Sequence, residues 1–288
     1  MYKLRQSAIG TYEQCPKLCE IQFGSPQGVE AVGNDDPRFQ NKYSQSGIAL
    51  HEVMEEWGIK KLKGEQMSLE DMHNLLEDKF NKIDMKYYDN PEDFCNYKIT
   101  MHDEIDWLYD TYCQTTPIAV EKSFEFDELA PGLPIVTGTI DRIEGNLQYK
   151  DIDLIDYKSG SHKKFTKKEL SNNVQATLYA LAFKRMYGFY PKHFIFVFPK
   201  FQREKIIKID EDFINRGLTR VRSIWMKMAI GEFNPPLKPN KFWCANFCPL
   251  TKDDCPRKAH KRYMNNWDNV KYDRFVPETS QIELEGGE

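Results

Sequence analysis

The sequence lacks several features that mark common classes of protein. No apolar run approaches the length of about 20 residues that a membrane-spanning helix needs. The stretch from Met1 to Ser7 has no apolar core, so we expect no secretory signal peptide and a cytoplasmic protein without membrane attachment. Internal repeats and low-complexity blocks are also missing, which argues against a repeat protein or a linker.

Cysteines are few, and their number is odd. Seven cysteines in a reducing compartment are not expected to form a disulfide framework. The count fits four ligands of a metal or cluster together with spare thiols. Cys95 and Cys113 fall within a predicted helix, where we expect ordinary buried thiols. The other five lie near the two ends of the chain, at positions 15, 19, 244, 248 and 255.

The composition is that of a folded protein. Hydrophobic residues make up 40% and aromatic residues 13% of the 288 residues, which is enough for a packed interior in one elaborated domain. The net charge is −4, so a protein of this kind that binds nucleic acid needs its positive charge in clusters.

The hydrophobic spacing changes along the chain from helical to alternating. Periodicity and turn signals predict helices at 7–15 (with Ser7 as a possible N-cap), 46–63, from about 69, 93–115, 168–187 and 211–230, and strands at 118–126, 134–143, 151–158, 193–198 and 204–209. The first three strands are expected to form an antiparallel meander. This order predicts an α/β core with a helical N-terminal insertion.

Two predicted strands that follow each other in the chain carry two carboxylates and one lysine ammonium group, which together suit phosphate chemistry. Asp156 and Lys158 lie two residues apart, so their side chains project to one side of the strand. If the preceding strand pairs beside this one, Asp141 reaches the same place. Carboxylate oxygens suit Mg²⁺ or Mn²⁺, and a lysine can orient water and stabilise negative charge on a phosphate. The alternative is a surface salt bridge on a strand edge.

Five short motifs occur in a fixed order, and together they resemble the RecB-like PD-(D/E)xK nucleases. The motifs are Gly47-Ile48-Ala49-Leu50-His51, Glu121, Gly138-Thr139-Ile140-Asp141-Arg142, Asp156-Tyr157-Lys158 and Gln175-Ala176-Thr177-Leu178-Tyr179. The resemblance runs from about residue 7 to 257. It implies a restriction-endonuclease-like core, with a mixed central sheet flanked by helices. It also implies the segments 1–42, 43–116 (helical insertion), 117–232 (nuclease core), 233–275 (Cys-rich) and 276–288 (acidic tail).

The resemblance also assigns roles to residues of this chain. His51, Asp141, Asp156 and the carbonyl oxygen of Tyr157 would bind the metal, and Lys158 would be catalytic. Glu121 would support the metal from a second position, with Glu125 as its rival. Gln175 and Tyr179 share one helix face. They would contact the active site and the DNA strand, or else pack the helix on the sheet.

Some nucleases of this kind hold an iron–sulfur cluster, and the cysteines match that arrangement. The resemblance implies a [4Fe–4S] cluster bound by Cys15, Cys244, Cys248 and Cys255, which would fasten the two ends of the chain together. Cys15-Pro16 fits the N-terminal ligand, whereas the spacing from Cys244 to Cys248 is one residue wider than usual. The spacing from Cys15 to Cys19 is the same as that from Cys244 to Cys248, so a structural Zn²⁺ site with four thiolate ligands is the alternative.

Lysines follow the acidic site directly and suggest where DNA lies. Lys163, Lys164, Lys167 and Lys168, together with Arg142, are candidate phosphate contacts. A second basic run spans 257–263, with Trp267 and Tyr272 after it for base stacking. No base-reading motif is evident, which favours sequence-independent cutting of DNA that is single-stranded or has free ends.

Three functions are compatible with these features. The first is a DNA exonuclease of recombination, repair or phage replication, which would act alone or beside a separate helicase or recombination protein because the chain has no phosphate-binding Gly-x-x-x-x-Gly-Lys loop. A nuclease that trims spacers for CRISPR arrays is a close variant. The second is an inactive module that holds DNA ends, and the third is a zinc-fastened structural protein.

Overall fold

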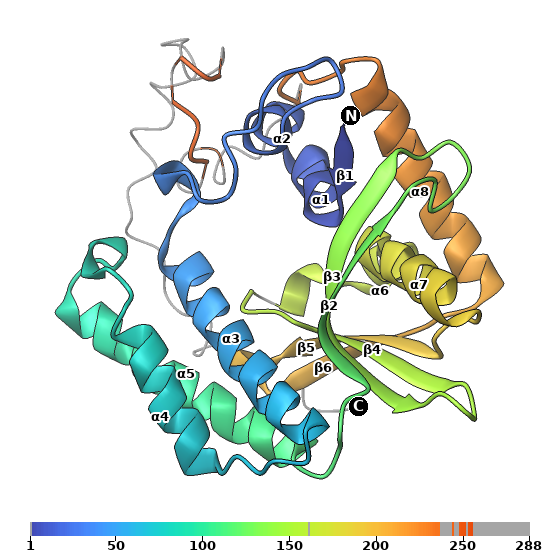
Figure 1. Ribbon diagram of the computed structural model, residues 1–288. Helices are drawn as coiled ribbons and strands as arrows, with labels where there is room; N and C mark the ends of the chain where they lie inside the picture. The colour runs from blue at the N-terminus through green and yellow to red at the C-terminus, as the bar shows by residue number, and fades with distance from the viewer. Residues whose placement is uncertain (1, 161, 237–243, 245–247, 252, 256–288) are drawn as a thin grey trace, which may run out of the picture. The chain divides into compact units, whose positions relative to one another are not determined.

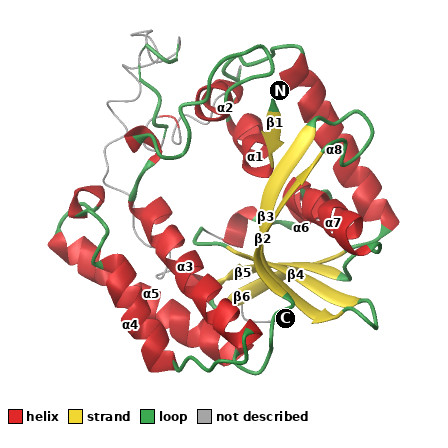
Figure 2. Cartoon of the chain, in the orientation of Figure 1, coloured by secondary structure: helices red, strands yellow, loops and turns green. Residues whose placement is uncertain are grey.

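The computed structural model describes residues 2–160, 162–236, 244, 248–251 and 253–255 (Figure 1). The chain divides into two compact units, Met1–Asn234 and Pro235–Glu288, and each is described here by itself. The second basic run and the acidic tail lie outside the described residues. In the first unit, helices flank a central sheet of six strands, so the predicted mixed α/β fold is confirmed (Figure 2).

The sheet is mixed in direction. Its main path runs β1-β3-β4-β5-β6, and β2 pairs with β3 off this path. The strands are β1 (Lys3–Arg5), β2 (Ala119–Phe126), β3 (Ile135–Asn146), β4 (Asp151–Tyr157), β5 (His193–Phe198) and β6 (Arg203–Lys208). The predicted meander of β2, β3 and β4 is antiparallel, whereas β4 and β5 run parallel. The helical connection between β4 and β5 makes this parallel pairing possible.

Helices cover the two faces of the sheet (Figure 1). The helices are α1 (Gln6–Gln14), α2 (Pro16–Phe23), α3 (Lys42–Leu62), α4 (Leu69–Phe80), α5 (Pro91–Tyr112), α6 (Lys167–Leu170), α7 (Val174–Tyr187) and α8 (Glu211–Ala229). Short 3₁₀ turns lie at Pro37–Phe39, Met85–Tyr87, His162–Lys164 and Pro199–Phe201.

The alternation of side chains along the strands divides the interior into two hydrophobic clusters. Leu154 of β4 and Phe196 of β5 pack in one cluster with α1, α7 and α8. Ile155 and Tyr157 of β4 pack in the other, with α3, α4 and α5. Because successive side chains of a strand point to opposite faces, β4 is buried on both sides and holds its residues rigidly.

The observed elements differ from the predicted ones at several boundaries. Strand β1 was not predicted, because three residues give no periodic signal. Ser7 is not an N-cap, since α1 begins after Arg5. Helix α3 begins at Lys42 because Asn41 and Ser44 form a capping box. The predicted helix at 168–187 is two helices, because Asn173 caps a new one.

The helical layer of α3, α4 and α5 approaches the sheet closely at one glycine. A Cβ atom on Gly58 of α3 would lie 2.4 Å from Cγ1 of Val120 in β2, and only Gly leaves room for this approach. Gly58 lies seven residues after His51, so both residues face the same side of α3. The closeness of α3 to β2 therefore sets how far His51 reaches toward the sheet.

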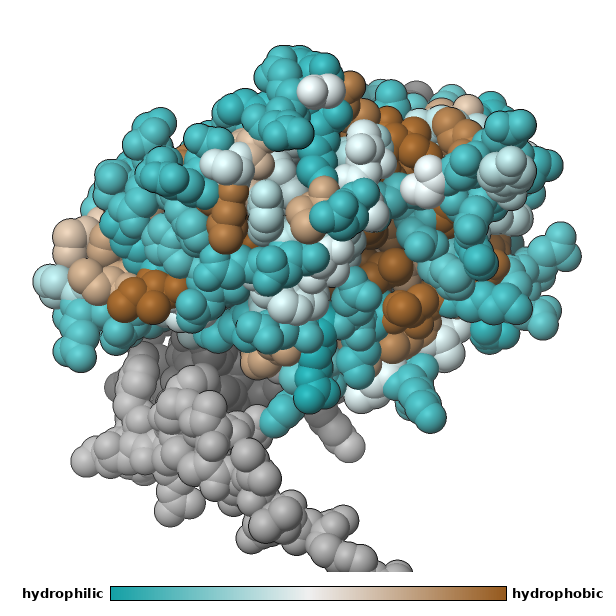
Figure 3. Space-filling model, turned by 90° about the horizontal axis from the view of Figure 1, so that it is seen from below, coloured by the Kyte–Doolittle hydropathy of each residue, from teal (hydrophilic) through white to brown (hydrophobic). Residues whose placement is uncertain are grey.

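Among the described residues, none of the helices combines the length and the hydrophobicity that a membrane span requires. On the face of the molecule in Figure 3, hydrophilic residues predominate and hydrophobic ones gather in small groups.

The contact between Gly58 and Val120 gives a prediction about stability. We expect Gly58→Ala to lower the free energy of unfolding by about 1–3 kcal/mol, because the methyl group collides with a partly buried β-branched side chain. Val120→Ala removes the colliding atom, so the double variant should be more stable than the sum of the two single effects predicts. Urea unfolding of the four proteins measures this coupling.

Gly10→Ala serves as the control for this experiment. Gly10 also lies within a helix, but its added Cβ would meet nothing within 4 Å. It should therefore leave stability unchanged or raise it slightly. Equal destabilisation by both glycine substitutions would show that the close approach of α3 to β2 is not the cause.

Candidate metal centre and active site

The site forms where β3 and β4 part from each other. The ladder between them ends at the pair Arg142 and Ile155, one residue before Asp141. Instead, the Tyr157 backbone N–H donates to Oδ2 of Asp141 at 2.8 Å. On its other side β4 stays paired with β5 up to Val197. A carboxylate thus takes the place of a backbone acceptor and is fixed by the fold of the main chain.

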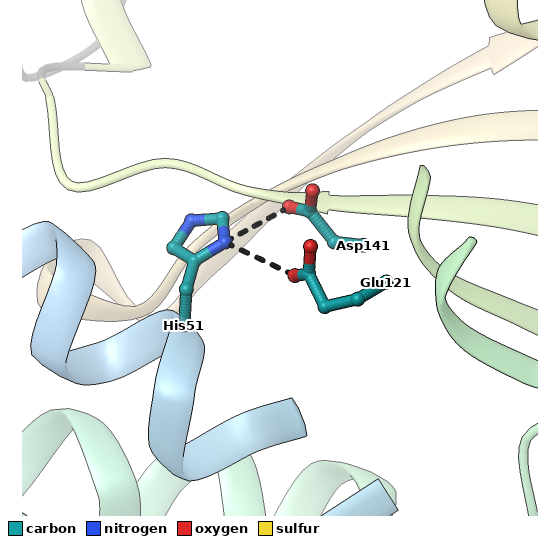
Figure 4. Close-up of side chains that lie close together, drawn as sticks. All are labelled: His51, Glu121 and Asp141. Carbon is teal, nitrogen blue, oxygen red and sulfur yellow. Dashed lines mark ion pairs between the residues drawn. The ribbon is translucent and has the colours of Figure 1, made fainter. Parts of the chain in front are cut away.

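Helix α3 brings an imidazole to this point. His51 Nδ1 lies 3.5 Å from Asp141 Oδ2 and 3.7 Å from Glu121 Oε1 (Figure 4). Its Nε2 lies 3.2 Å from the carbonyl oxygen of Tyr157. When Nε2–H donates to that carbonyl, the lone pair of Nδ1 faces the two carboxylates. The ring is therefore oriented as a ligand for a cation.

Glycines of the sequence motifs explain how these elements come so close. A Cβ atom on Gly47, one turn before His51, would lie 3.3 Å from Oγ of Ser159. A Cβ atom on Gly138 of β3 would lie 2.7 Å from the ring of Phe124 and 3.1 Å from that of Tyr179. The first glycine lets α3 approach the segment after Lys158, and the second lets the Tyr179 ring pack on β3.

Three ligand atoms gather in one group. His51, Glu121 and Asp141 each offer an atom, and these atoms all lie within 4.8 Å of one another. Glu121 lies in β2 between Val120, which pairs with Arg142, and Lys122, which pairs with Ile140. Its positive φ of 43° lies in the left-handed region, which is unusual for a strand residue. Strained backbone of this kind concentrates at functional sites. Glu125, the rival, pairs instead with Lys3 at 2.7 Å on the surface.

Asp156 lies beside this group with its own partners. Lys158 Nζ is 2.7 Å from Asp156 Oδ2, and Gln175 of α7 donates from Nε2 to Oδ1. Gln175 thus contacts Asp156 of the site. Tyr179 is buried and packs edge-on against Phe124. A contact of either residue with DNA stays a prediction. The prediction that Asp156 and the Tyr157 carbonyl also bind the metal stays a prediction.

The pKa values show that the site holds more negative charge than its neighbours neutralise. Burial raises the pKa of Asp141 to about 7, and the nearby Asp156 carboxylate adds to the rise. Burial alone would lower the pKa of His51, but Glu121 and the two aspartates outweigh it and raise the pKa to about 9. A site with these donors favours a positive ion, which fits a divalent metal with carboxylate and imidazole ligands.

Arg142 is a correction to the expected DNA contacts. Its side chain is 1% exposed, and Nη2 lies 2.5 Å from Oε1 of Glu144. The guanidinium group lies over the rings of Trp57 and Tyr112. Because neighbouring residues of a strand face opposite sides, Arg142 points into the helical layer and away from Asp141. It therefore cannot contact a phosphate. Lys163, Lys167 and Lys168 are exposed, and the side chain of Lys164 lies outside the described residues.

The cysteines also differ in part from expectation. Cys95 is exposed and Cys113 partly exposed, so the prediction of buried thiols is wrong for both. Cys19 is fully buried, and its Sγ donates to the carbonyl oxygen of Ala8 at 3.2 Å. Burial raises the pKa of the Cys19 thiol to about 12, which disfavours the thiolate form that binds metals.

Comparison with known proteins agrees with the geometry of the site. A family model for the PD-(D/E)XK nuclease superfamily matches residues 4–259. A search of curated proteins finds no match. Members of this superfamily use divalent metals, and the central mixed sheet with flanking helices is the restriction-endonuclease-like fold that the motifs implied. The chain belongs to the PD-(D/E)XK nuclease superfamily.

Proposed function

We propose that this protein is a divalent-metal-dependent DNA exonuclease. The observation that carries the proposal is the convergence of His51, Glu121 and Asp141 from three separate elements, with the Asp156–Lys158 pair beside them. A metal-binding carboxylate group next to a positive side chain promotes phosphodiester hydrolysis. The free-ended DNA substrate is inferred from the surface lysines that follow the site and from the lack of a base-reading motif in the sequence.

His51, Glu121 and Asp141 would hold Mg²⁺ or Mn²⁺, with Asp156 and the Tyr157 carbonyl as further candidates. When bound there, such an ion lowers the pKa of water and offsets negative charge on the scissile phosphate. The chain's own residues set the direction of approach. Asp141 and Asp156 are buried, whereas the side chains of His51, Glu121 and Lys158 are 34%, 28% and 30% exposed. The substrate phosphate would therefore meet the site on the side of these three groups.

Lys158 and Gln175 hold Asp156 from two directions. The Lys158 ammonium lies 2.7 Å from Asp156 Oδ2, and its backbone N–H donates to the carbonyl oxygen of Val197 at 2.8 Å. The backbone of Lys158 is therefore held against β5, and the ion pair with Asp156 holds Nζ. In this position the ammonium group can orient a water molecule toward phosphorus and stabilise charge on the phosphate oxygens.

We also propose that Cys15, Cys244, Cys248 and Cys255 bind a [4Fe–4S] cluster. Cys15 lies between α1 and α2, with Pro16 as the first residue of α2. The high pKa of Cys19 makes Cys15 the better ligand of the two. In the second unit, Thr251 and Asp254 hydrogen-bond each other, and the Cys255 N–H donates to the Thr251 carbonyl oxygen at 3.2 Å. This turn fixes the backbone at Cys255.

Lys158→Ala tests the catalytic proposal. We expect the rate of DNA cleavage to fall by about 10²- to 10⁴-fold, because the ammonium group beside the phosphate is lost. Binding of an end-labelled oligonucleotide, measured by fluorescence anisotropy, should change little. Cleavage is measured on linear and circular DNA, single- and double-stranded, with Mg²⁺ or Mn²⁺, and circular DNA should resist an exonuclease.

Lys192→Ala is the matched control, because Lys192 forms a similar ion pair with Asp151 at the other end of β4. It should cut DNA like the unaltered protein. Cleavage by Lys158→Ala at the normal rate would contradict the catalytic assignment. An unaltered protein that binds DNA ends but never cuts them would instead be an end-binding module.

Glu121→Gln tests the metal site. We expect the Kd for Mn²⁺, measured by calorimetry, to rise at least about 10-fold, because a charged ligand is replaced by a neutral amide. Glu125→Gln changes the same residue type on the same strand, where the carboxylate pairs with Lys3, and should leave the Kd unchanged. If both variants bind Mn²⁺ like the unaltered protein, Glu121 is not a ligand.

Metal analysis of protein purified without oxygen tests the cluster. We expect a brown protein with iron and acid-labile sulfide, both lost in Cys15→Ser and retained in Cys19→Ser. Cys95→Ser is a further control, since Cys95 is exposed on α5. Zinc without iron would contradict the cluster and favour the structural zinc site.

A further inference from the structure

A second group of ionisable side chains lies in the helical layer, outside the nuclease site. His73 projects from α4 and His102 from α5, and their Nδ1 atoms are 2.6 Å apart. The two rings lie with their centroids 4.7 Å apart at an angle of 37°. The two side chains are 26% and 27% exposed, so solvent and small ions can reach them.

Each imidazole is held from behind by a carboxylate of the other helix. His73 Nε2 lies 2.8 Å from Asp106 Oδ1 of α5, and His102 Nε2 lies 2.8 Å from Glu77 Oε1 of α4. On each helix the carboxylate follows the histidine by four residues, so both project from the same face. Each helix therefore supplies one histidine and the carboxylate that binds the histidine of the other helix. Lys98 contacts the second oxygen of Glu77.

This arrangement decides where the ring hydrogens lie. An ionised carboxylate only accepts hydrogen bonds, so both Nε2 atoms must be donors. In a neutral imidazole the other nitrogen then carries a lone pair, and the two Nδ1 lone pairs of His73 and His102 face each other. Two lone pairs at 2.6 Å repel unless a positive centre lies between them. A proton or a metal ion can be that centre.

We propose that His73 and His102 form a binding site for a divalent transition-metal ion of the zinc class. Imidazole nitrogen is a preferred ligand of Zn²⁺, and a carboxylate on the far nitrogen is the usual device that orients such a ligand. With Zn–N bonds of 2.0–2.1 Å in tetrahedral geometry, the two Nδ1 atoms would move to about 3.3 Å apart. Partly exposed rings on the surfaces of two helices can make this small shift, and water would fill the remaining positions.

The ion would join α4 to α5. These two helices pack with α3, the helix that carries His51, around one hydrophobic cluster. Binding to the folded protein alone stabilises it, so the helical layer should unfold at a higher temperature when the site is filled. This role is independent of phosphodiester hydrolysis.

Zinc binding to the full chain tests the proposal. We expect calorimetry to give one more equivalent of Zn²⁺ for the unaltered protein than for His73→Gln/His102→Gln. His51→Gln should keep that equivalent, and the cysteines are the same in all variants, so the difference isolates this pair. Glu77→Gln/Asp106→Asn should weaken binding at this site by about 10- to 100-fold. Zn²⁺ should also raise the Tm of the unaltered protein more than that of the double histidine variant.

His193→Gln is the matched control, because His193 pairs with Asp153 at 2.9 Å and no second histidine in the described part of the chain faces it. It should bind as many equivalents of Zn²⁺ as the unaltered protein. If the unaltered protein and the double histidine variant bind the same number of Zn²⁺ equivalents, the proposal is overturned. A proton shared between the two Nδ1 atoms would then account for their closeness. If the double variant does not fold, anomalous diffraction from zinc-soaked crystals decides: a peak between the two Nδ1 atoms supports the site, and its absence overturns it.

Discussion

Two aspartate carboxylates held beside each other and out of water dominate the electrostatics of this protein. Burying a charged carboxylate is unfavourable unless hydrogen bonds and opposite charges replace the lost water, and a second carboxylate nearby adds repulsion. Asp141 accepts a hydrogen bond from a backbone N–H and faces His51. Asp156 forms an ion pair with Lys158 and accepts a hydrogen bond from Gln175. The raised pKa of Asp141 shows that these partners do not fully offset the burial and repulsion. The site is therefore prepared for a further positive charge.

The main chain rather than flexible loops fixes this arrangement. Where β3 and β4 part, the Asp141 carboxylate accepts the hydrogen bond of Tyr157, while β5 keeps β4 in place on its other side. Glu121 reaches the site with its backbone in the left-handed region, a strain of about 1–3 kcal/mol that the pairing of β2 with β3 before and after this residue can hold. Ligands fixed in this way need little rearrangement when an ion binds.

Helices approach the same point from both faces of the sheet. Helix α7 supplies Gln175 from one face, and α3 supplies His51 from the other. The absence of side chains at Gly47 and Gly58 allows α3 to come close enough. Because α4 and α5 pack behind α3, the histidine pair proposed as a zinc site joins the helices that support the His51 helix.

The sequence by itself determined most of the elements and the chemistry of the site. Period-two spacing placed Asp156 and Lys158 on one side of a strand, and the order of the motifs identified the superfamily that the family model confirms. Propensity could not find β1, because three residues form a strand only where β3 offers an edge. It also missed Asn41 and Asn173, whose roles as caps depend on a few local hydrogen bonds rather than on periodicity.

Only the tertiary structure decided which of several side chains of the same type reach the metal site. Glu121 and Glu125 are alike in sequence, but the fold brings a carboxylate oxygen of the first within 4.8 Å of His51 and Asp141, whereas β1 carries the lysine that pairs with the second. Arg142 belongs to the same motif as Asp141, yet its side chain points to the opposite face of the strand and lies in the helical layer. The pair His73 and His102 shows no motif at all, since its residues meet only when α4 and α5 pack together. Contacts between residues distant in the chain depend on packing, which local sequence patterns do not encode.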